Sequence, residues 1–248
     1  MGGRIRVKSE EDVGSEFTII FPLSDDSRDA ISFSLVTDQA GMNDVFVLQR
    51  KVLGGEKGYL EGTIHRAEDE KATHILAFRG LHPVGTVSLM TSEKLWPLPI
   101  SNYFDVSSVV KSKHCSEILR LAVLPDMRNS LVSLGLIVLV FLLARSKGIK
   151  DLIIDVFADD VKTIKLYKKF GFEEVGTYYS PSAVTVLALQ SETPMEKDQS
   201  QLRHFVRPLF NRLKTLFDFG EYTQGVLDEM DRILSADADF SDEQDETG

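Results

Sequence analysis

Residues 160–176 read Asp160-Val161-Lys162-Thr163-Ile164-Lys165-Leu166-Tyr167-Lys168-Lys169-Phe170-Gly171-Phe172-Glu173-Glu174-Val175-Gly176, and this stretch decides the fold. Its first part predicts a helix over residues 160–170 that stops at Gly171, a residue type that often ends helices. Residues 172–175 predict a strand directly after the helix, and the apolar residues 152–157 predict another strand before it. The stretch is therefore expected to close a βαβ unit.

The elements expected before and after this unit complete the sheet. Further strands are predicted over residues 31–36, 74–78, 84–90, 117–124 and 184–189, with Gly80 in a short hairpin turn at residues 79–82. Asp38 is expected to cap a helix that runs toward Gly54, and an apolar helix is expected over residues 130–147, ended by Gly148. Because antiparallel strands come before the βαβ unit, the predicted fold class is α/β with a mixed sheet.

Composition limits the class of protein. The 248 residues are 43% hydrophobic and 27% charged, which suits one large domain and excludes a disordered or fibrous chain. The single cysteine, Cys115, excludes an intramolecular disulfide framework and a Cys-based zinc finger, and no metal site is expected. The net charge is −10, but residues 235–248 alone carry six acidic groups and no basic group, so charge argues only weakly against nucleic acid. The start lacks a signal peptide, and the apolar residues 131–144 are too few for the ~18 to 20 of a membrane span, so a cytoplasmic protein is expected.

The chain divides into five zones by composition. A β-hairpin extension is expected over residues 1–23, a polar linker over 24–30, the main domain over 31–190, an amphipathic helical extension over 191–234 and an acidic, disordered tail over 235–248. In the extension, apolar side chains recur at helical spacing: Leu202, Phe205, Val206, Leu209, Phe210, Leu213, Leu216 and Phe217. Basic side chains lie elsewhere around the helix: Lys197, Arg203, Arg207, Arg212 and Lys214. Packing on the main domain is favoured over the alternatives, which are docking of an acidic carrier protein and peripheral membrane contact through residues 199–217.

The segment from Leu166 to Phe172 carries a family resemblance. Leu-Tyr-x-x-Phe-Gly-Phe at a helix end resembles the last conserved segment of the GNAT superfamily of N-acyltransferases, and the predicted order of elements over residues 31–190 matches that superfamily. The resemblance implies the GNAT fold, an acyl thioester co-substrate (acyl-CoA, or acyl-phosphopantetheine on acyl carrier protein) and no metal. It also implies that Tyr167 protonates the leaving thiolate. Taken alone, Tyr167 would be a packing aromatic beside Phe170 and Phe172.

A second segment, residues 121–133, resembles the strand and helix start at which GNAT proteins bind the donor's pyrophosphate. A helix N-terminus attracts anions because its first N–H groups lack partners within the helix. The cofactor-binding residues implied by the resemblance are Leu121, Ala122, Val123, Arg128, Asn129, Ser130, Leu131, Ser133 and Asp160. Leu131 and Ser133 replace the family's usual glycines, so a pyrophosphate is expected to approach the backbone less closely. Asp160 replaces a common Asn.

The sequence resembles one branch of the superfamily more than the others. Glu117-Ile118-Leu119-Arg120-Leu121-Ala122-Val123, together with the upstream Trp96-Pro97-Leu98-Pro99-Ile100, resembles the N-acyl amino acid synthases and acyl-homoserine-lactone synthases. Those relatives take a fatty acyl chain from acyl carrier protein, whose phosphopantetheine has one phosphate and no adenine nucleotide.

This branch suggests roles for three parts of the strand. Glu117 is the candidate base that removes the proton of an amine nucleophile, and Arg120 is the candidate substrate-binding residue. The backbone N–H groups around Ala122 and Val123 are the candidate oxyanion donors. The alternative for Glu117 and Arg120 is an ion pair near a strand start, worth about 0 to 1 kcal/mol and functionally silent.

Three functions remain open from the sequence. The first is an N-acyltransferase that moves an acyl group from a phosphopantetheine thioester to a small primary amine, with an amino acid as one candidate. The second is an acetyl-CoA-dependent GNAT acetyltransferase. The third is a GNAT-like binding or sensor module without activity, because Gly2-Gly3-Arg4-Ile5-Arg6-Val7 and Phe17-Thr18-Ile19-Ile20-Phe21 resemble the closing hairpin of a histidine-kinase ATPase domain.

Overall fold

A computed structural model describes residues 4–10, 14–20, 30–59, 61–64, 67–92, 98–110, 115–128, 130–149, 151–180, 182–189, 207–218, 224–225, 227–228 and 231. The predicted acidic tail and most of the predicted linker lie outside these ranges. Near the N-terminus, β1 (Arg4–Glu10) and β2 (Gly14–Ile20) pair antiparallel in a two-stranded sheet. This is the hairpin that alternation in the sequence predicts.

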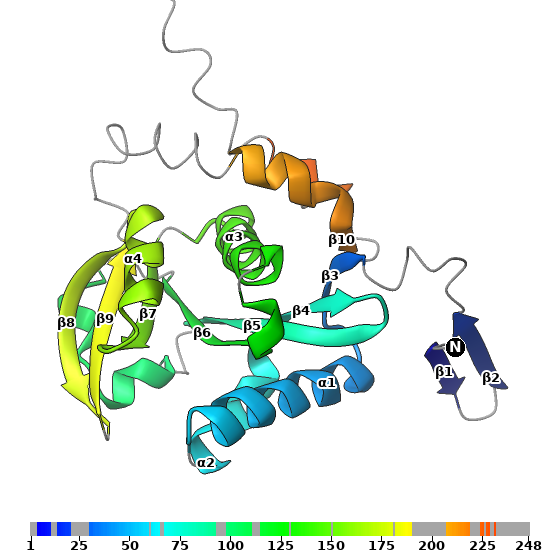
Figure 1. The fold of residues 1–248 in the computed structure, drawn as a ribbon, viewed down its shortest axis with the longest axis horizontal. Coiled ribbons are helices and arrows are strands. Elements are labelled where there is room, and N and C mark those ends of the chain that lie inside the picture. Colours follow the sequence, from blue (N-terminus) through cyan, green and yellow to red (C-terminus); the bar gives the residue numbers. More distant parts are fainter. Residues whose placement is uncertain are drawn as a thin grey trace, which may run out of the picture.

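The main domain is built on one eight-stranded sheet with the order β10-β3-β4-β5-β6-β7-β9-β8 (Figure 1). Its strands are β3 (Ile31–Leu35), β4 (Thr73–Arg79), β5 (His82–Thr91), β6 (Cys115–Val123), β7 (Asp151–Phe157), β8 (Glu173–Tyr179), β9 (Ala183–Leu189) and β10 (Phe217–Asp218). The pairs β10–β3 and β6–β7 are parallel and the other pairs are antiparallel. The predicted class, α/β with a mixed sheet, is confirmed.

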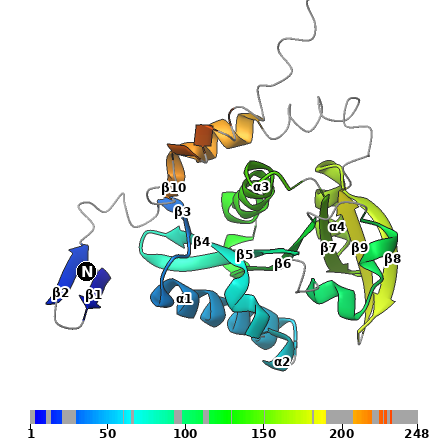
Figure 2. The same cartoon turned by 180° about the vertical axis from the view of Figure 1, so that it is seen from behind.

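Helices cover both faces of the sheet. The helices are α1 (Gln39–Gln49), which continues into a π-helical turn (Arg50–Glu56), α2 (Glu61–Ile64), α3 (Leu131–Ser146) and α4 (Val161–Lys169). Short 3-10 turns occupy Ala67–Lys71, Pro99–Asn102, Val106–Ser108, Pro125–Met127 and Lys214–Leu216. Figures 1 and 2 show α1 and α3 on opposite faces of β4, β5 and β6.

The predicted helix boundaries follow from local chemistry. Asp38 starts α1, because its carboxylate accepts a hydrogen bond from the Gly41 N–H at 2.7 Å. Gly148 and Gly171 follow α3 and α4 with φ angles of 73° and 84°, a left-handed conformation that favours glycine. The signals that predicted these helix ends are therefore confirmed.

The apolar helix α3 lies in the middle of the core. Residues 135–144 are all buried, so the helix is covered on every side, as its unbroken apolar sequence predicts. At Gly135 the helix comes so close to β3 that an added Cβ would lie 2.5 Å from the Phe33 ring. Glycine is required there by this close approach.

The segment after residue 206 packs on the main domain. Residues 207–213 are helical, and Phe210 and Leu213 are fully buried in the same core cluster as α3. Phe217 begins β10, which pairs with β3, and its ring meets the Phe33 ring edge to face at 5.9 Å. The apolar side chains of this part of the extension thus contact the domain, which is the packing alternative, while Arg207 and Arg212 are exposed.

Divergence of β6 and β7 positions the candidate site. The two strands pair only from Cys115↔Asp151 to Glu117↔Ile153, and beyond these pairs the described parts of the strands separate. On its other side, β6 pairs with β5 with a bulge, in which Arg120 and Leu121 oppose the single residue Val87. Arg120 has a φ of 55°, which is uncommon for a residue with a side chain. Around Arg120 and Leu121, β6 is therefore unpaired on the side of β7 and irregularly paired on the side of β5.

Candidate active site

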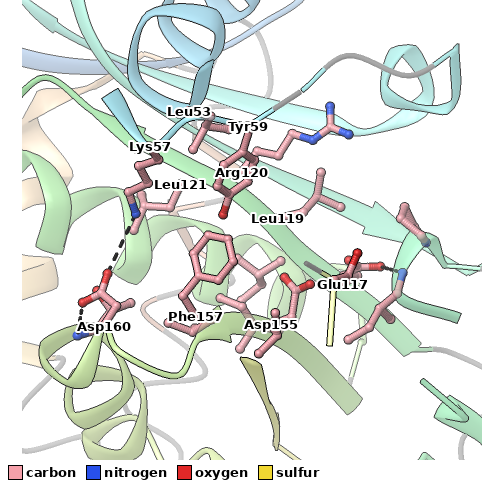
Figure 3. Close-up of a pocket in the computed structure, with 18 of the residues that line it drawn as sticks. Leu53, Lys57, Tyr59, Glu117, Leu119, Arg120, Leu121, Asp155, Phe157 and Asp160 are labelled. Carbon is pink, nitrogen blue, oxygen red and sulfur yellow. Dashed lines mark hydrogen bonds and ion pairs between the residues drawn. The ribbon is translucent and has the colours of Figure 1, made fainter. Parts of the chain in front are cut away.

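A cavity of about 590 Å³ fills the gap between β6 and β7 (Figure 3). Its walls come from β6, β7, α4, the end of the π-helical turn, and the segment containing Pro99 and Tyr103. Figure 3 shows the carboxylates of Glu117 and Asp155 at one end, and Lys57 and Asp160 at the other. The cavity thus combines an apolar wall with two separate polar ends, the composition typical of small-molecule sites.

Tyr167 lines this cavity from α4 and is fully buried. Its hydroxyl makes no hydrogen bond with any of the described residues. Burial raises the pKa of Tyr167, and the negative charges of Asp155 and Asp160 raise it further, so the group stays protonated at neutral pH. Its ring contacts Phe172 edge to face at 5.4 Å. The packing expected of this aromatic is present, but packing leaves an unsatisfied buried hydroxyl unexplained.

Glu117 lies on β6 at the point where β6 and β7 begin to separate. Its side chain is 3% exposed, and its carboxylate accepts a hydrogen bond from the backbone N–H of Ile100 at 3.0 Å. β6 is an interior strand, so Glu117 and Arg120 do not lie at a sheet edge, and Arg120 forms an ion pair with Asp69. A buried carboxylate in a cavity wall can accept a proton from a bound amine, directly or through one water.

Arg120 is held by residues behind the cavity wall. Its guanidinium pairs with Asp69 and donates to the backbone carbonyl of Ile64. The Arg120 side chain is 10% exposed and the Asp69 side chain 0% exposed, so the ion pair is buried. Arg120 lines the cavity, but its charged group is committed to Asp69 rather than available for a substrate. The ion pair lies next to the bulge of β6, and substrate binding by Arg120 stays a prediction.

The predicted oxyanion donors lie at the bulge and just beyond it. Leu121 lines the cavity together with residues 117–120, whereas Ala122 and Val123 are buried in the core and are not among the lining residues. A bulge leaves an extra residue outside the regular ladder of hydrogen bonds. The backbone at Arg120 and Leu121 is thus placed nearer the cavity than the predicted pair Ala122 and Val123.

The N-terminus of α3 is capped by its own side chains. The Ser130 hydroxyl donates to the Met127 carbonyl at 2.6 Å and accepts from the Val132 N–H at 3.2 Å. Ser133 donates to the Arg128 carbonyl at 3.3 Å, and Leu131 is half-buried. The predicted residue Asn129 lies outside the described residues. The hydroxyls of Ser130 and Ser133 are therefore already hydrogen-bonded at the helix start where a pyrophosphate was expected to bind.

Arg128 is also engaged, by a residue far away in sequence. Its guanidinium forms two contacts of 2.5 Å with the carboxylate of Glu56, and its Nε donates to the Val123 carbonyl at 3.1 Å. The hydrogen bond from Arg128 holds the pKa of Glu56 below its usual value. The guanidinium that was expected to meet a donor phosphate is thus paired with Glu56 in this structure.

Asp160 lies at the opposite end of the cavity from Glu117. Its carboxylate accepts from the Thr163 N–H at 3.2 Å and so caps α4, as expected of the residue that starts this helix. It also lies 3.9 Å from the Lys57 ammonium group. A donor that passes this end of the cavity meets a pair of opposite charges rather than the neutral amide of the common Asn.

The lining residues that were not predicted from the sequence include Lys57, Tyr59, Asp155 and Tyr178. The Tyr178 hydroxyl donates to the Asp155 carboxylate, and the Tyr59 ring meets Phe157 edge to face at 5.2 Å. Asp155 could have been found, because it is the one charged residue within the apolar run 152–157. Lys57 and Tyr59 follow the π-helical turn, and no sequence signal relates that turn to the cavity.

The described residues contain no site for metal binding, no membrane-spanning helix and no activated cysteine. No cluster of three or more histidine, cysteine, aspartate or glutamate side chains there is arranged to hold a metal ion. None of the described helices combines the length and apolar character needed to cross a membrane. Cys115 is buried, and burial raises the pKa of its thiol to about 12, so it is not an activated nucleophile.

Three solved structures share the fold of this chain, and the names of two of them include a synthase activity. FeeM, an N-acyl amino acid synthase from uncultured soil microbes, is similar with 16% identity and a TM-score of 0.56, over 69% of this chain and 94% of that chain. BjaI, a CoA-dependent acyl-homoserine lactone synthase, has 15% identity and a TM-score of 0.57, over 79% and 99%. ElaA from Escherichia coli has 15% identity and a TM-score of 0.51, over 64% and 99%. At these identities the likeness establishes the GNAT fold.

A family model supplies the stronger comparison. The model of the N-acyl amino acid synthase FeeM matches residues 55–189, a range that contains Glu117, Asp155 and Tyr167. The curated proteins contain no significant match to this chain. None of these comparisons supports the resemblance of residues 1–23 to a histidine-kinase domain. Because the model matches more than half of the chain, the protein belongs to the FeeM family of N-acyl amino acid synthases and is an N-acyltransferase with the GNAT fold.

Proposed function

We propose that the protein transfers an acyl group from a phosphopantetheine thioester to a small primary amine in the cavity between β6 and β7. The observation that carries this proposal is the fully buried Tyr167, which lines the cavity with a protonated hydroxyl that has no partner among the described residues. An unsatisfied buried hydroxyl costs about 1–3 kcal/mol, and such a cost is typical of groups that serve a ligand.

Different groups in the cavity wall carry out different steps of the reaction. Glu117 accepts the proton of the amine, directly or through water, as the nitrogen attacks the thioester carbonyl. The carbonyl oxygen gains negative charge, which backbone N–H groups at the β6 bulge stabilise. The C–S bond then breaks, and the Tyr167 hydroxyl donates its proton to the leaving thiolate. The products are an amide and a free phosphopantetheine thiol.

We infer acyl carrier protein as the preferred donor. At the start of α3, Ser130 caps the helix with its own hydroxyl, Leu131 and Ser133 stand in place of glycines, and Arg128 is paired with Glu56. These features disfavour close binding of a pyrophosphate. A carrier protein presents one phosphate and adds its own surface to the binding energy. The alternative is acyl-CoA or acetyl-CoA as donor, and BjaI, which shares the fold, is CoA-dependent by name.

Arg128→Ala is expected to weaken donor binding by roughly 1–3 kcal/mol, because a charge-assisted contact to the donor phosphate is lost. Calorimetric titration with a non-reactive thioether analogue of the donor measures the effect. Glu56→Gln provides the matched comparison, since it removes the carboxylate that competes for the same guanidinium and should tighten binding. Equal affinities in all three proteins would exclude Arg128 from the donor site.

Transfer of a medium or long acyl chain from acyl carrier protein is expected to be at least about tenfold faster than transfer of an acetyl group from coenzyme A at matched concentrations. The exposed residues Arg207 and Arg212 would steer the acidic carrier, so reversing both to glutamate should slow carrier-dependent turnover and flatten its salt dependence. Reversal of the exposed Lys51 and Lys71 serves as the control. The acetyltransferase alternative would be established if turnover is faster with acetyl-CoA than with the acylated carrier protein and is unchanged by the reversal at Arg207 and Arg212.

A further inference from the structure

One end of the cavity is more acidic than acceptance of a simple amine requires. Among the side chains that line the cavity, Glu117, Asp155 and Asp160 are acidic, whereas Lys57 and Arg120 are basic. The Lys57 ammonium group lies beside Asp160 at the far end, and the Arg120 guanidinium is balanced by the buried Asp69 behind the wall. Negative charge therefore gathers at the end where Glu117 and Asp155 lie (Figure 3).

A stacked pair of tyrosine rings lies next to the second of these carboxylates, Asp155. Asp155 is half-buried on β7 and accepts a hydrogen bond from the Tyr178 hydroxyl. The Tyr178 ring stacks on Tyr103, with 5.4 Å between centroids and 10° between planes. Tyr103 is 44% exposed and belongs to the lining, so the stacked pair lies where the cavity meets solvent. A carboxylate at the hydroxyl end of a stacked pair of tyrosine rings is a combination that can bind an organic ammonium group, through charge at the carboxylate and through the ring surfaces beside it.

We propose that the amine acceptor carries a second positive charge, which Asp155 and the rings of Tyr178 and Tyr103 bind while Glu117 takes the proton of the attacking nitrogen. This inference rests on the proposed function and names its substrate class. A diamine and a basic amino acid share the required chemistry. An acceptor whose remote group is a carboxylate would meet Glu117 and Asp155 with the same sign of charge and is disfavoured.

The second charge also assists the chemistry. A positive group a few bonds away lowers the pKa of the attacking ammonium, so Glu117 removes its proton more readily. The remote ammonium stays protonated at Asp155 throughout. The bonds that change are those of the acyl transfer alone, in which the C–N bond forms and the C–S bond breaks. The attacking nitrogen loses two protons, the first from the ammonium to Glu117 and on to solvent before attack, and the second to Glu117 as the amide forms. Tyr167 gives one proton to sulfur and regains one from solvent, and Glu117 releases its second proton to solvent.

Acceptors that differ only in the remote group test the proposal on the full-length protein with one fixed acyl donor. The first set is 1,4-diaminobutane, n-pentylamine and 5-aminopentanoate, and the second is lysine and 2-aminoheptanoate. The kcat/KM of the diamine should exceed that of n-pentylamine by about tenfold or more, with 5-aminopentanoate the poorest of its set. Lysine should exceed 2-aminoheptanoate in the same way if the acceptor is a basic amino acid. Equal or better rates for both uncharged analogues would overturn the inference.

Asp155→Asn keeps a hydrogen-bond acceptor for Tyr178 and removes only the charge. The ratio of kcat/KM for 1,4-diaminobutane over n-pentylamine should fall by about tenfold, mainly through KM. The matched control is Asp159→Asn, an exposed carboxylate four residues along that is not part of the lining, and it should leave the ratio unchanged. An equal loss with both acceptors in Asp155→Asn would overturn the cation subsite.

A binding measurement separates this inference from the proposed function. Calorimetry of 1,4-diaminobutane and n-pentylamine with the wild-type protein and with Asp155→Asn reports on the subsite without any turnover. If no amine is acylated, the proposed function fails, while tighter binding of the diamine that is lost in Asp155→Asn still supports the cation subsite. If the two amines bind alike, the subsite is refuted whatever the activity.

Discussion

Tyr167→Phe is expected to lower kcat by about 10²-fold or more while leaving the protein as stable as before or slightly more stable. The loss follows because the variant cannot protonate the thiolate as the C–S bond breaks. The stability follows because the hydroxyl is buried and has no partner among the described residues, so its removal costs no hydrogen bond with them and relieves an unsatisfied polar group. The ring contact with Phe172 is retained.

Two measurements check this expectation. Steady-state kinetics with a saturating donor gives kcat, and denaturant unfolding gives the free energy of unfolding. Tyr179→Phe is the matched control, since Tyr179 is 80% exposed on β8 and should change neither quantity. A Tyr167→Phe variant with unchanged kcat would reduce Tyr167 to a packing aromatic, which is the interpretation that its helix face alone would favour.

Local signals in the sequence predicted most of the fold. Each correctly predicted feature depends on residues within one or two turns of each other. These features are the helix ends at Gly148 and Gly171, the helix cap at Asp38 and the βαβ unit around α4. The short strand β10 was missed, because two residues that pair with β3 from the other end of the chain have no periodicity of their own. The 3-10 turns at Pro99–Asn102 and Val106–Ser108 were missed for a similar reason.

The candidate site could be predicted only where it lies within one element. Tyr167 and Glu117 belong to segments with a recognisable pattern, and both line the cavity. The ion pair of Arg128 joins residues 72 positions apart in sequence, and that of Arg120 joins residues 51 positions apart. Partners at such separations are chosen by the tertiary fold, so sequence patterns singled out Arg120 and Arg128 but left their partners unnamed.

Arg120 shows how large the effect of such a partner can be. Arg120→Met is expected to lower the free energy of unfolding by about 3–5 kcal/mol, because Asp69 stays fully buried without its guanidinium. The left-handed backbone of Arg120 adds to the sensitivity, since the ion pair helps to hold a conformation that side chains disfavour. The sequence-based alternative of an exposed pair worth about 0 to 1 kcal/mol predicts a much smaller loss.

Denaturant unfolding of four proteins decides between these expectations. Arg120→Met combined with Asp69→Leu should recover most of the stability of the single variant, because a buried ion pair can be replaced by apolar groups at little cost. Arg50→Met is the matched control, as its pair with Glu61 is exposed on both sides and should matter little. If Arg120→Met lowers the free energy of unfolding no more than Arg50→Met does, the β6 bulge is stable without the ion pair of Arg120. If the loss is large and kcat also falls in the rescued double variant, the guanidinium contributes to the placement of the β6 backbone beyond its share in stability.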